Sequence, residues 1–378
     1  MHKSHDIDFI FPISGDCINC RDLTAIDGKE YLKASVSAPV GKRVFISGAE
    51  AREETEGVYT AMIPTQEGRN TLTANIASED AQKEITVFNM GDDALLSYRI
   101  SSDDNIRFLM ELTAGSYASI FDHPYLAVYK KAHDLYGARV HLNLFYELDE
   151  EARACFTPPL PYFNLTMMTD RYKDEFIRNS DWLKLAFHSR SEFPPRPYDN
   201  ASADTITKDH RDVCREIERF AGKECISDTA TVHYGSANLE CTKALRKLGI
   251  RSLTGYFTLS SSGRPRVSYY ASPELARHIG CRDFFVDEES DMIFAKIDSV
   301  LNTGSYDEVI KEVKDVMANA HCGGFVSVMI HEQYFYPDYK SHLADFEKRV
   351  LGAAKILYEG GYRGKLISEA TKMLNKKN

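Results

Sequence analysis

The chain has 378 residues, a length that suggests two domains, one of them large. Its hydrophobic content of 43% is enough for packed cores, and its formal net charge of −10 argues against nucleic acid or anionic lipid as the main partner. No apolar run approaches the roughly 18 residues of a membrane span, so we expect a globular protein and no membrane partner. No apolar leader follows Met1, which predicts a cytoplasmic protein, although a chain trimmed of its leader would look the same.

Residues 1–91 contain short alternating segments separated by turns. Val58 to Ile63 and the alternating Leu72, Ala74 and Ile76 are typical of strands, and turn residues such as Asp27-Gly28 recur between them. This spacing predicts a small all-β sandwich of the immunoglobulin-like kind. No group of polar residues in it indicates chemistry, so we expect a spacer or docking role.

Residues 92–378 alternate between strand-like and helix-like segments, which predicts an α/β domain with parallel strands. The expected strands are 96–103, 139–146, 182–187, 229–232, 251–259, 325–330 and 365–367. The segment 147–180 is rich in proline and aromatic residues and shows no regular pattern. Connections of that length usually carry function or cover a site.

Four of the expected strands end in polar residues that can bind metals or carry protons. They end at Asp103-Asp104, His188, His233 and His331. In an α/β barrel the catalytic groups gather at the carboxyl ends of the strands, so we expect these side chains to meet. Two simpler interpretations stay open. Asp104 or Asn105 suits the N-cap of a following helix, and a single histidine after a strand is more often structural.

These residues resemble the polysaccharide deacetylase superfamily, carbohydrate esterase family 4, whose domain is a distorted (β/α) barrel. The resemblance covers roughly residues 96–367. The family's first strand ends in two aspartates, as in Ser102-Asp103-Asp104, and its His-Ser/Thr-x-x-His motif matches residues 188–192 except that the last residue is glutamate. His331 fits a late Leu-x-His motif, whereas the segment around His233 lacks the Arg and Pro of the family's Arg-x-Pro-x-Gly motif.

The resemblance implies a metal-dependent hydrolase that removes N- or O-acetyl groups from a carbohydrate. Asp103 would be the base that takes a proton from water, and His331 the acid that protonates the leaving group. Asp104 and His188 would be ligands of a divalent metal, for which zinc is the simplest choice.

The third metal ligand has two candidates, Glu192 and His233. Position favours Glu192, because it stands where the family motif has its second histidine. Charge favours His233, because a second carboxylate would cancel the charge of the ion and weaken its pull on a water proton. The prolines after Glu192 also force an extended path. We therefore expect Asp104, His188 and His233, with Glu192 as the alternative.

Several side chains near these strand ends are expected to contact the sugar, namely Trp182, Tyr198, Tyr234, Glu332 and Tyr334. For the aromatic ones, packing in the core is an equally good interpretation in a chain with 20 Phe and 21 Tyr. The missing motif residues also leave open a non-catalytic protein that keeps the barrel as a glycan-binding module or scaffold. Nothing in the sequence indicates the oligomeric state.

Overall fold

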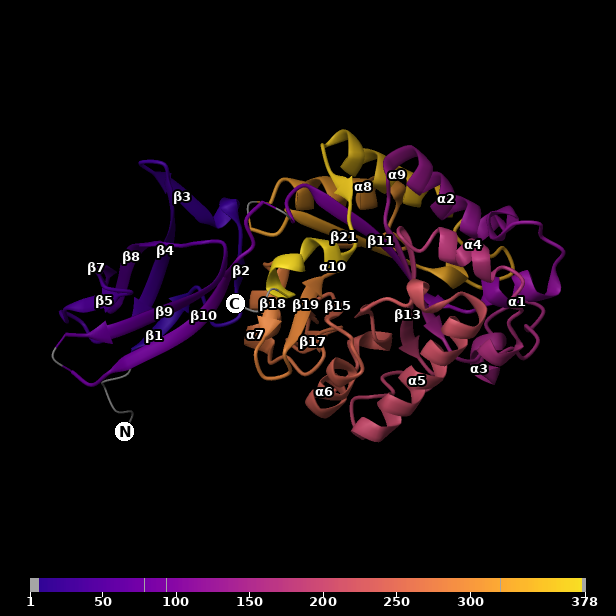
Figure 1. Cartoon of the computed structure of the whole chain (residues 1–378), viewed down its shortest axis with the longest axis horizontal. Coiled ribbons are helices and arrows are strands. Elements are labelled where there is room, and N and C mark those ends of the chain that lie inside the picture. Colours follow the sequence, from indigo (N-terminus) through magenta and orange to yellow (C-terminus); the bar gives the residue numbers. More distant parts are fainter. Residues whose placement is uncertain (1–6, 78, 93, 320, 376–378) are drawn as a thin grey trace. The chain divides into compact units, whose positions relative to one another are not determined.

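The structure is a computed structural model that describes residues 7–77, 79–92, 94–319 and 321–375. The chain divides into two compact units. The first contains residues up to 95 together with 284–288 and the segment from 371, and the second contains residues 96–283 and 289–370. Figure 1 labels the helices and many of the strands of both units.

The first unit is built from two five-stranded sheets. One has the order β1-β4-β8-β7 with β3 on β4, and the other has the order β2-β10-β9-β5-β6. The strands are β1 (Asp8–Phe11), β2 (Cys17–Ile18), β3 (Leu23–Ile26), β4 (Lys29–Ser37), β5 (Val44–Ile46), β6 (Ala49–Glu50), β7 (Arg52–Thr55), β8 (Val58–Pro64), β9 (Gly68–Ile76) and β10 (Gln82–Asn89). The unit also contains β18 (Phe284–Asp287) and two short 3-10 turns, Cys20–Asp22 and Lys372–Asn375. The expectation of an all-β segment is confirmed, and its immunoglobulin-like character stays a prediction.

Alternation along the strands creates the core of the first unit. In β4 the side chains of Leu32, Ala34 and Val36 are fully buried, while the residues between them are exposed or half-buried. Successive side chains in a strand point to opposite faces, so this period of two presents one apolar face. That face packs against buried residues of the other sheet such as Val44 and Leu72.

The second unit contains parallel strands in two groups. The larger has the order β13-β12-β11-β21-β20, with β22 beside β11, and every one of these pairs is parallel. Its strands are β11 (Ser97–Asn105), β12 (Val140–Phe145), β13 (Leu183–Ser189), β20 (Ser299–Val300), β21 (Phe325–His331) and β22 (Arg363–Gly364). The other group pairs β14 (Thr229–Ala230), β15 (Ser252–Gly255) and β19 (Met292–Lys296), and a hairpin joins β16 (Thr258–Leu259) to β17 (Pro265–Arg266).

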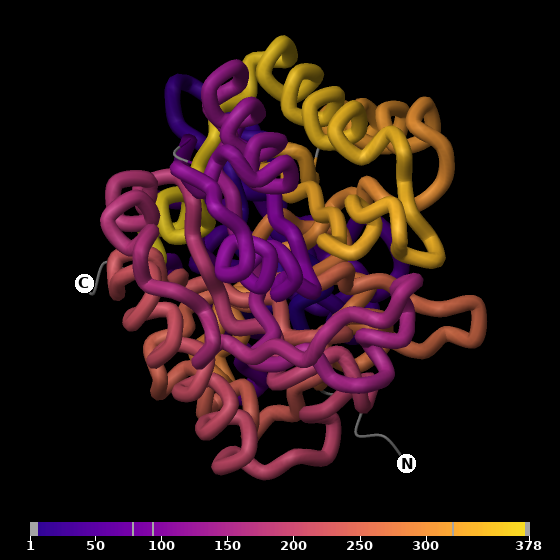
Figure 2. The backbone as a smooth tube through the Cα atoms, turned by 90° about the vertical axis from the view of Figure 1, so that its right-hand side faces the viewer, coloured from indigo at the N-terminus to yellow at the C-terminus, as the bar shows by residue number. Residues whose placement is uncertain are grey.

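Helices connect these strands. They are α1 (Arg107–Ala114), α2 (Pro124–Tyr136), α3 (Glu150–Arg153), α4 (Lys173–Arg178), α5 (Ala203–Phe220), α6 (Leu239–Lys247), α7 (Pro273–Ile279), α8 (Tyr306–Met317), α9 (Phe346–Glu359) and α10 (Ile367–Ala370). Short 3-10 turns lie at Ile120–Asp122, Leu165–Met167, Lys223–Cys225, His233–Gly235 and Glu332–Phe335. Helices α8 and α9 pack side by side (Figure 1, Figure 2). None of the helices that the structure describes is long and apolar enough to cross a membrane.

The α/β prediction for the second unit is confirmed, and closure into a barrel stays a prediction because the described strands fall in separate sheets. The strand expected at 251–259 is interrupted, because Phe257 has a left-handed φ of 49° and the chain enters the β16–β17 hairpin. The strand expected at 365–367 lies earlier, at Arg363–Gly364. The segment expected to be irregular, 147–180, contains the short helices α3 and α4.

Candidate metal centre

Asp103 and Asp104 lie at the carboxyl end of β11, and both line the same cavity. In a regular strand two successive side chains would point to opposite faces. Here the pairing of β11 with β12 shifts its register between Ser102 and Asn105, and Asp104 has a φ of 62°, in the left-handed region. A bulge of this kind aims a side chain in a new direction. It therefore lets two adjacent carboxylates reach one site.

Asp104, His188 and His233 bring three candidate ligand atoms together. His188 Nε2 lies 3.0 Å from Asp104 Oδ1, and His233 Nδ1 lies 3.1 Å from His188 Nε2 and 3.4 Å from Asp104 Oδ1. Within the part of the chain that the structure describes, this is the one group of three or more His, Cys, Asp or Glu side chains that could hold a metal ion.

Backbone carbonyls fix the orientation of both imidazoles. His188 Nδ1 contacts the carbonyl oxygen of Thr231, and His233 Nε2 lies 2.9 Å from that of Glu192. A carbonyl oxygen only accepts, so these two ring nitrogens carry the protons of the neutral rings. In the neutral rings the lone pairs on His188 Nε2 and His233 Nδ1 then face Asp104, whereas a ring that gains a second proton donates a hydrogen bond to that carboxylate. Histidine ligands of metals are commonly anchored through the second ring nitrogen in this way.

The cluster favours a bound cation. Burial raises the pKa of Asp104, but hydrogen bonds with His188 and His233 outweigh it and hold that pKa well below its ordinary value, so the carboxylate is ionised. Burial lowers the pKa of His188, but the hydrogen bond with Asp104 and the charges of Asp103 and Asp104 outweigh it and raise that pKa. A carboxylate and two facing lone pairs thus attract positive charge, whether proton or metal.

The separations of the three donor atoms fit one small divalent ion. Zinc binds imidazole nitrogen and carboxylate oxygen at about 2.0 to 2.2 Å, so two ligand atoms at angles of about 90° to 110° lie about 2.8 to 3.6 Å apart. The observed separations are 3.0, 3.1 and 3.4 Å. The residues present therefore fit a zinc-like ion with the ligand set Asp104, His188 and His233.

Asp103 lies beside this cluster and is held by a different group. Asn143 of β12 donates from Nδ2 to Asp103 Oδ1 at 2.7 Å. Burial raises the pKa of Asp103, an effect that the charges of His188 and His331 oppose. The result is a buried carboxylate that accepts a proton more readily than it would in water.

His331 lies opposite Asp103 on the neighbouring strand, because the two residues pair in the parallel register of β11 and β21. Its backbone N–H and its ring Nδ1 lie 3.2 and 2.8 Å from Asn302 Oδ1. The amide oxygen accepts, so Nδ1 carries a proton and Nε2 is the nitrogen left for exchange with a substrate. His331 also lines the cavity of Asp103 and Asp104.

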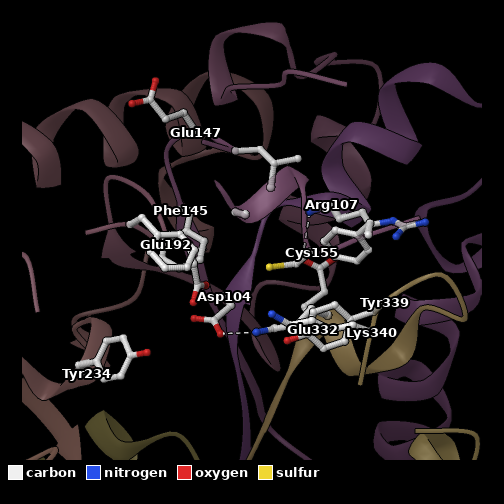
Figure 3. A pocket seen from close by; sticks show the side chains of 15 residues that line it. Asp104, Arg107, Phe145, Glu147, Cys155, Glu192, Tyr234, Glu332, Tyr339 and Lys340 are labelled. Carbon is white, nitrogen blue, oxygen red and sulfur yellow. Dashed lines mark hydrogen bonds between the residues drawn. The ribbon is translucent and has the colours of Figure 1, made fainter. Parts of the chain in front are cut away.

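Two cavities meet at the cluster. The larger, of about 460 Å³, contains both aspartates, both histidine ligands and His331, and four tyrosines line it: Tyr234, Tyr256, Tyr334 and Tyr339. The smaller, of about 250 Å³, is drawn in Figure 3. Asp104, Glu192, Tyr234, Gln333 and Tyr339 line both.

Glu192 lies beside the cluster, where it lines both cavities, but its carboxylate does not belong to the group of candidate ligands. Burial, followed by the charge of Asp104, raises its pKa to about 9, and a divalent ion at the cluster would lower it. The contribution of Glu192 in this structure is its backbone carbonyl, which orients His233.

Two aromatic residues expected at the site lie elsewhere. Trp182 precedes the first residue of β13, six residues and about 20 Å along the strand from His188. It is 2% exposed, stacks on His133 and donates from Nε1 to Asn179. Tyr198 is 1% exposed, and its hydroxyl lies 3.0 Å from Asp209. Both are core residues, whereas Tyr234 and Tyr334 do reach the larger cavity.

Glu332, expected to contact the sugar, instead caps a helix for which Asp104 or Asn105 was the expected N-cap. Its carboxylate accepts the backbone N–H groups of Ile106, Arg107 and Phe108 at 2.6, 3.0 and 2.6 Å. It therefore caps α1, where neither Asp104 nor Asn105 does so. The side chain faces the smaller cavity, but both oxygens are engaged, which removes it from the expected sugar contacts.

Three residues that hold the candidate site side chains by hydrogen bonds were not predicted from the sequence. Asn143 sits inside an expected strand at the positions that alternate with Val140, Leu142 and Leu144, and its polarity in a buried strand was the available signal. Gln333 donates from Nε2 to Asp104 Oδ2 at 2.8 Å and so fixes the carboxylate. Asn302 orients His331. For Gln333 and Asn302 no sequence motif gives a signal.

Comparisons with known proteins find distant structural similarity. No family model matches the chain, and no curated protein sequence does. A CE4 esterase of Streptococcus mutans has a TM-score of 0.38 at 11% identity, with 71% of this chain and 82% of that chain covered. The carbohydrate deacetylase Agd3 has a TM-score of 0.41 at 10% identity, with 93% and 71% covered. A 4-α-glucanotransferase of Thermococcus litoralis has a TM-score of 0.42 at 10% identity, with 74% and 40% covered.

All three TM-scores lie below 0.5. They therefore assign neither a family nor an activity to this chain, and the case for its function rests on its own residues.

Proposed function

We propose that this protein is a metal-dependent hydrolase that removes acyl groups from a carbohydrate, and that it is a divergent relative of the polysaccharide deacetylases. One observation carries the proposal. The side chains of Asp104, His188 and His233 converge on one point, both imidazoles are anchored on carbonyls, and Asp103 and His331 stand beside them as a base and an acid.

Asp104, His188 and His233 would hold the divalent ion, with zinc the simplest choice for this donor set. When bound, the ion would supply a Lewis acid that polarises a carbonyl and lowers the pKa of water. Asp104 is the single carboxylate of the set, which leaves a divalent centre net positive.

Asp103 is the proton acceptor of the proposed reaction. Its carboxylate is outside the ligand set, and Asn143 keeps it oriented. A buried carboxylate with a raised pKa is a stronger base than one in water, which suits the removal of a proton from water. His331, as an imidazolium, then gives the proton on Nε2 to the departing oxygen or nitrogen and becomes neutral, while Asn302 accepts from its Nδ1–H.

A sugar is the substrate that suits the larger cavity. Tyr234 and Tyr334 offer ring faces, and Tyr234 is 47% exposed, which leaves it free to stack on a sugar ring. The other walls are rich in groups that hydrogen-bond with hydroxyls, among them Thr231 and Arg266.

The test combines metal content with turnover. Protein purified without added zinc should carry about one divalent ion per chain, and it should hydrolyse acyl esters or amides of sugars. The variant Asp103→Asn should keep the ion and lose activity by about 100-fold or more, because it removes the base and retains the shape.

The matched control is Asp134→Asn, at a surface carboxylate 50% exposed that pairs with Lys130. It should keep both metal and turnover. Unchanged activity of Asp103→Asn would overturn the assignment of the base. A protein that binds metal and sugar but hydrolyses none of the esters or amides would instead be a glycan-binding module.

A further inference from the structure

The smaller cavity differs in chemistry from the larger one that it joins. Much of its wall is apolar, made by Phe145, Leu148, Ala152, Phe156 and Phe193. The two cavities share Asp104 and Glu192, and the larger one adds the imidazoles of His188, His233 and His331, which the smaller one lacks. Since the two cavities meet at Asp104, a molecule bound across this junction would have one polar and one apolar part (Figure 3).

Phe145, which lines the smaller cavity, also contacts the candidate metal ligands. The ring of Phe145 packs against both histidine ligands, with centroids 5.1 Å from His188 and 5.0 Å from His233. Its side chain is 3% exposed. Phe145 therefore connects the wall of the apolar cavity directly to the ligand set.

Three charged side chains of the smaller cavity are paired or exposed, whereas Asp104 and Glu192 line it where it joins the larger cavity. Arg107 pairs with Glu111 and Asp338 at 2.8 and 2.7 Å. Glu147 pairs with Arg190 at 2.9 Å, and its carboxylate points away from Asp104 in Figure 3. Lys340 is exposed at the protein surface. The five apolar residues line only the smaller cavity, so they distinguish what binds there from what binds in the larger one.

The volume of the smaller cavity is larger than an acetyl group would fill. An engineered apolar cavity of about 150 Å³ binds benzene. The smaller cavity, at about 250 Å³, has room for six carbon atoms and more, whereas acetyl would leave most of its apolar wall uncovered. Each buried methylene stabilises a complex by about 0.8 kcal/mol, so a longer chain would bind more tightly.

We infer that the smaller cavity binds the acyl part of the substrate and that this acyl group has about six carbon atoms. The inference rests on the proposed function and specifies the substrate class of that site. The sugar occupies the larger cavity and the acyl chain the smaller one, so that the bond to be cleaved lies at their junction beside Asp104. Hydrolysis adds the elements of water across that bond and releases a carboxylic acid and a sugar hydroxyl or amine.

The experiment compares acyl lengths on zinc-loaded full-length protein. The values of kcat/KM are measured with 4-nitrophenyl acetate, butyrate and hexanoate, and turnover is counted only where Asp103→Asn abolishes it. Hexanoate should exceed acetate by at least about tenfold. Independently of turnover, calorimetry with the free acids should show hexanoate binding at least about tenfold more tightly than acetate.

The variant Ala152→Leu places three more carbon atoms in the cavity wall, on α3, where Ala152 is 9% exposed. It should bring the hexanoate-to-acetate ratio close to one in both measurements. The control Ala154→Leu makes the same change at an exposed position two residues later and should leave the ratio unaltered.

The outcomes test the hydrolase activity and the assignment of the acyl cavity separately. Equal binding and equal turnover of acetate and hexanoate would overturn the acyl assignment and leave the hydrolase in place. Tighter hexanoate binding that Ala152→Leu removes, with no hydrolysis dependent on Asp103, would overturn the hydrolase and support the assignment of the cavity.

Discussion

The two units bury their side chains according to different rules. The core of the first unit is apolar throughout, from Leu32 to Val87, and it contains few buried polar residues. The second unit buries an aspartate, an asparagine and two histidines at the carboxyl ends of its strands. Burying polar groups costs free energy unless they are paired. The contacts among Asp104, His188 and His233 therefore mark the place where a chemical role is proposed to outweigh that cost.

The largest expected effect follows from removing a ligand. His233→Ala should reduce zinc affinity by more than the 10- to 100-fold that loss of an outer hydrogen-bonding partner costs. Glu192→Ala should keep zinc, because the backbone carbonyl that orients His233 remains. Competition with a chelator of known affinity measures both. Zinc loss in the glutamate variant alone would assign the third ligand to Glu192.

A smaller effect is expected from the residue that orients the carboxylate. Gln333→Leu removes the 2.8 Å hydrogen bond to Asp104 Oδ2 and should weaken zinc binding by about 10- to 100-fold. Gln66→Leu makes the same change at an exposed position of the first unit and should leave the affinity as it is. If the two variants bind zinc equally well, Gln333 does not position the ligand.

A third effect concerns pH and the polar interior of the second unit. Burial, and then the charge of Asp298, raises the pKa of Asp283 to about 7. The folded protein then holds a proton that the unfolded chain releases, so the contribution of Asp283 to stability is greatest below about pH 4 and falls as pH rises to about 7. The slope reaches about 1.4 kcal/mol per pH unit for one such group.

The variant Asp283→Asn tests this slope. Its side-chain oxygen can still accept the backbone N–H groups of Gly324 and Phe325, which lie 3.1 Å from Asp283 Oδ2. Urea unfolding at several pH values should show a flatter pH dependence and a gain in stability at pH 8. An unchanged slope would mean that Asp283 is ionised throughout.

The smallest expected effect on the metal centre comes from the first unit. Leu32→Ala should destabilise that unit by about 2 to 5 kcal/mol, because Leu32 is fully buried in its core. Zinc affinity should not change, since every proposed ligand lies in the second unit. Ile10→Ala, at a side chain 47% exposed, is the control for stability. Weaker zinc binding by folded Leu32→Ala would show that the two units are coupled.

Local patterns predicted much of this molecule. The alternation of Leu72, Ala74 and Ile76 predicts a strand, and these three residues are the buried ones at the end of β9. The strand ends at Asp103 and His188 were also readable, because a buried apolar run stops there at a polar residue.

What the sequence did not reveal depends on contacts between distant residues. The bulge that re-aims Asp104 arises from pairing with β12, and the cap of α1 comes from Glu332, far along the chain. The strand Met292–Lys296 was missed, because five residues are too few to show a period and its burial depends on β15. A local sequence pattern does not show which distant strand or side chain will pack against a segment.

Three consecutive residues have three different roles: His331 is the proposed proton donor, Glu332 caps α1, and Gln333 holds the Asp104 carboxylate, a proposed metal ligand. Insertions and deletions therefore have no tolerated position in this triplet. A single added residue would shift at least two of the three side chains off their partners, whereas many substitutions disturb only one. Anyone who grafts this centre onto another scaffold should transfer the triplet whole, together with the first turn of α1.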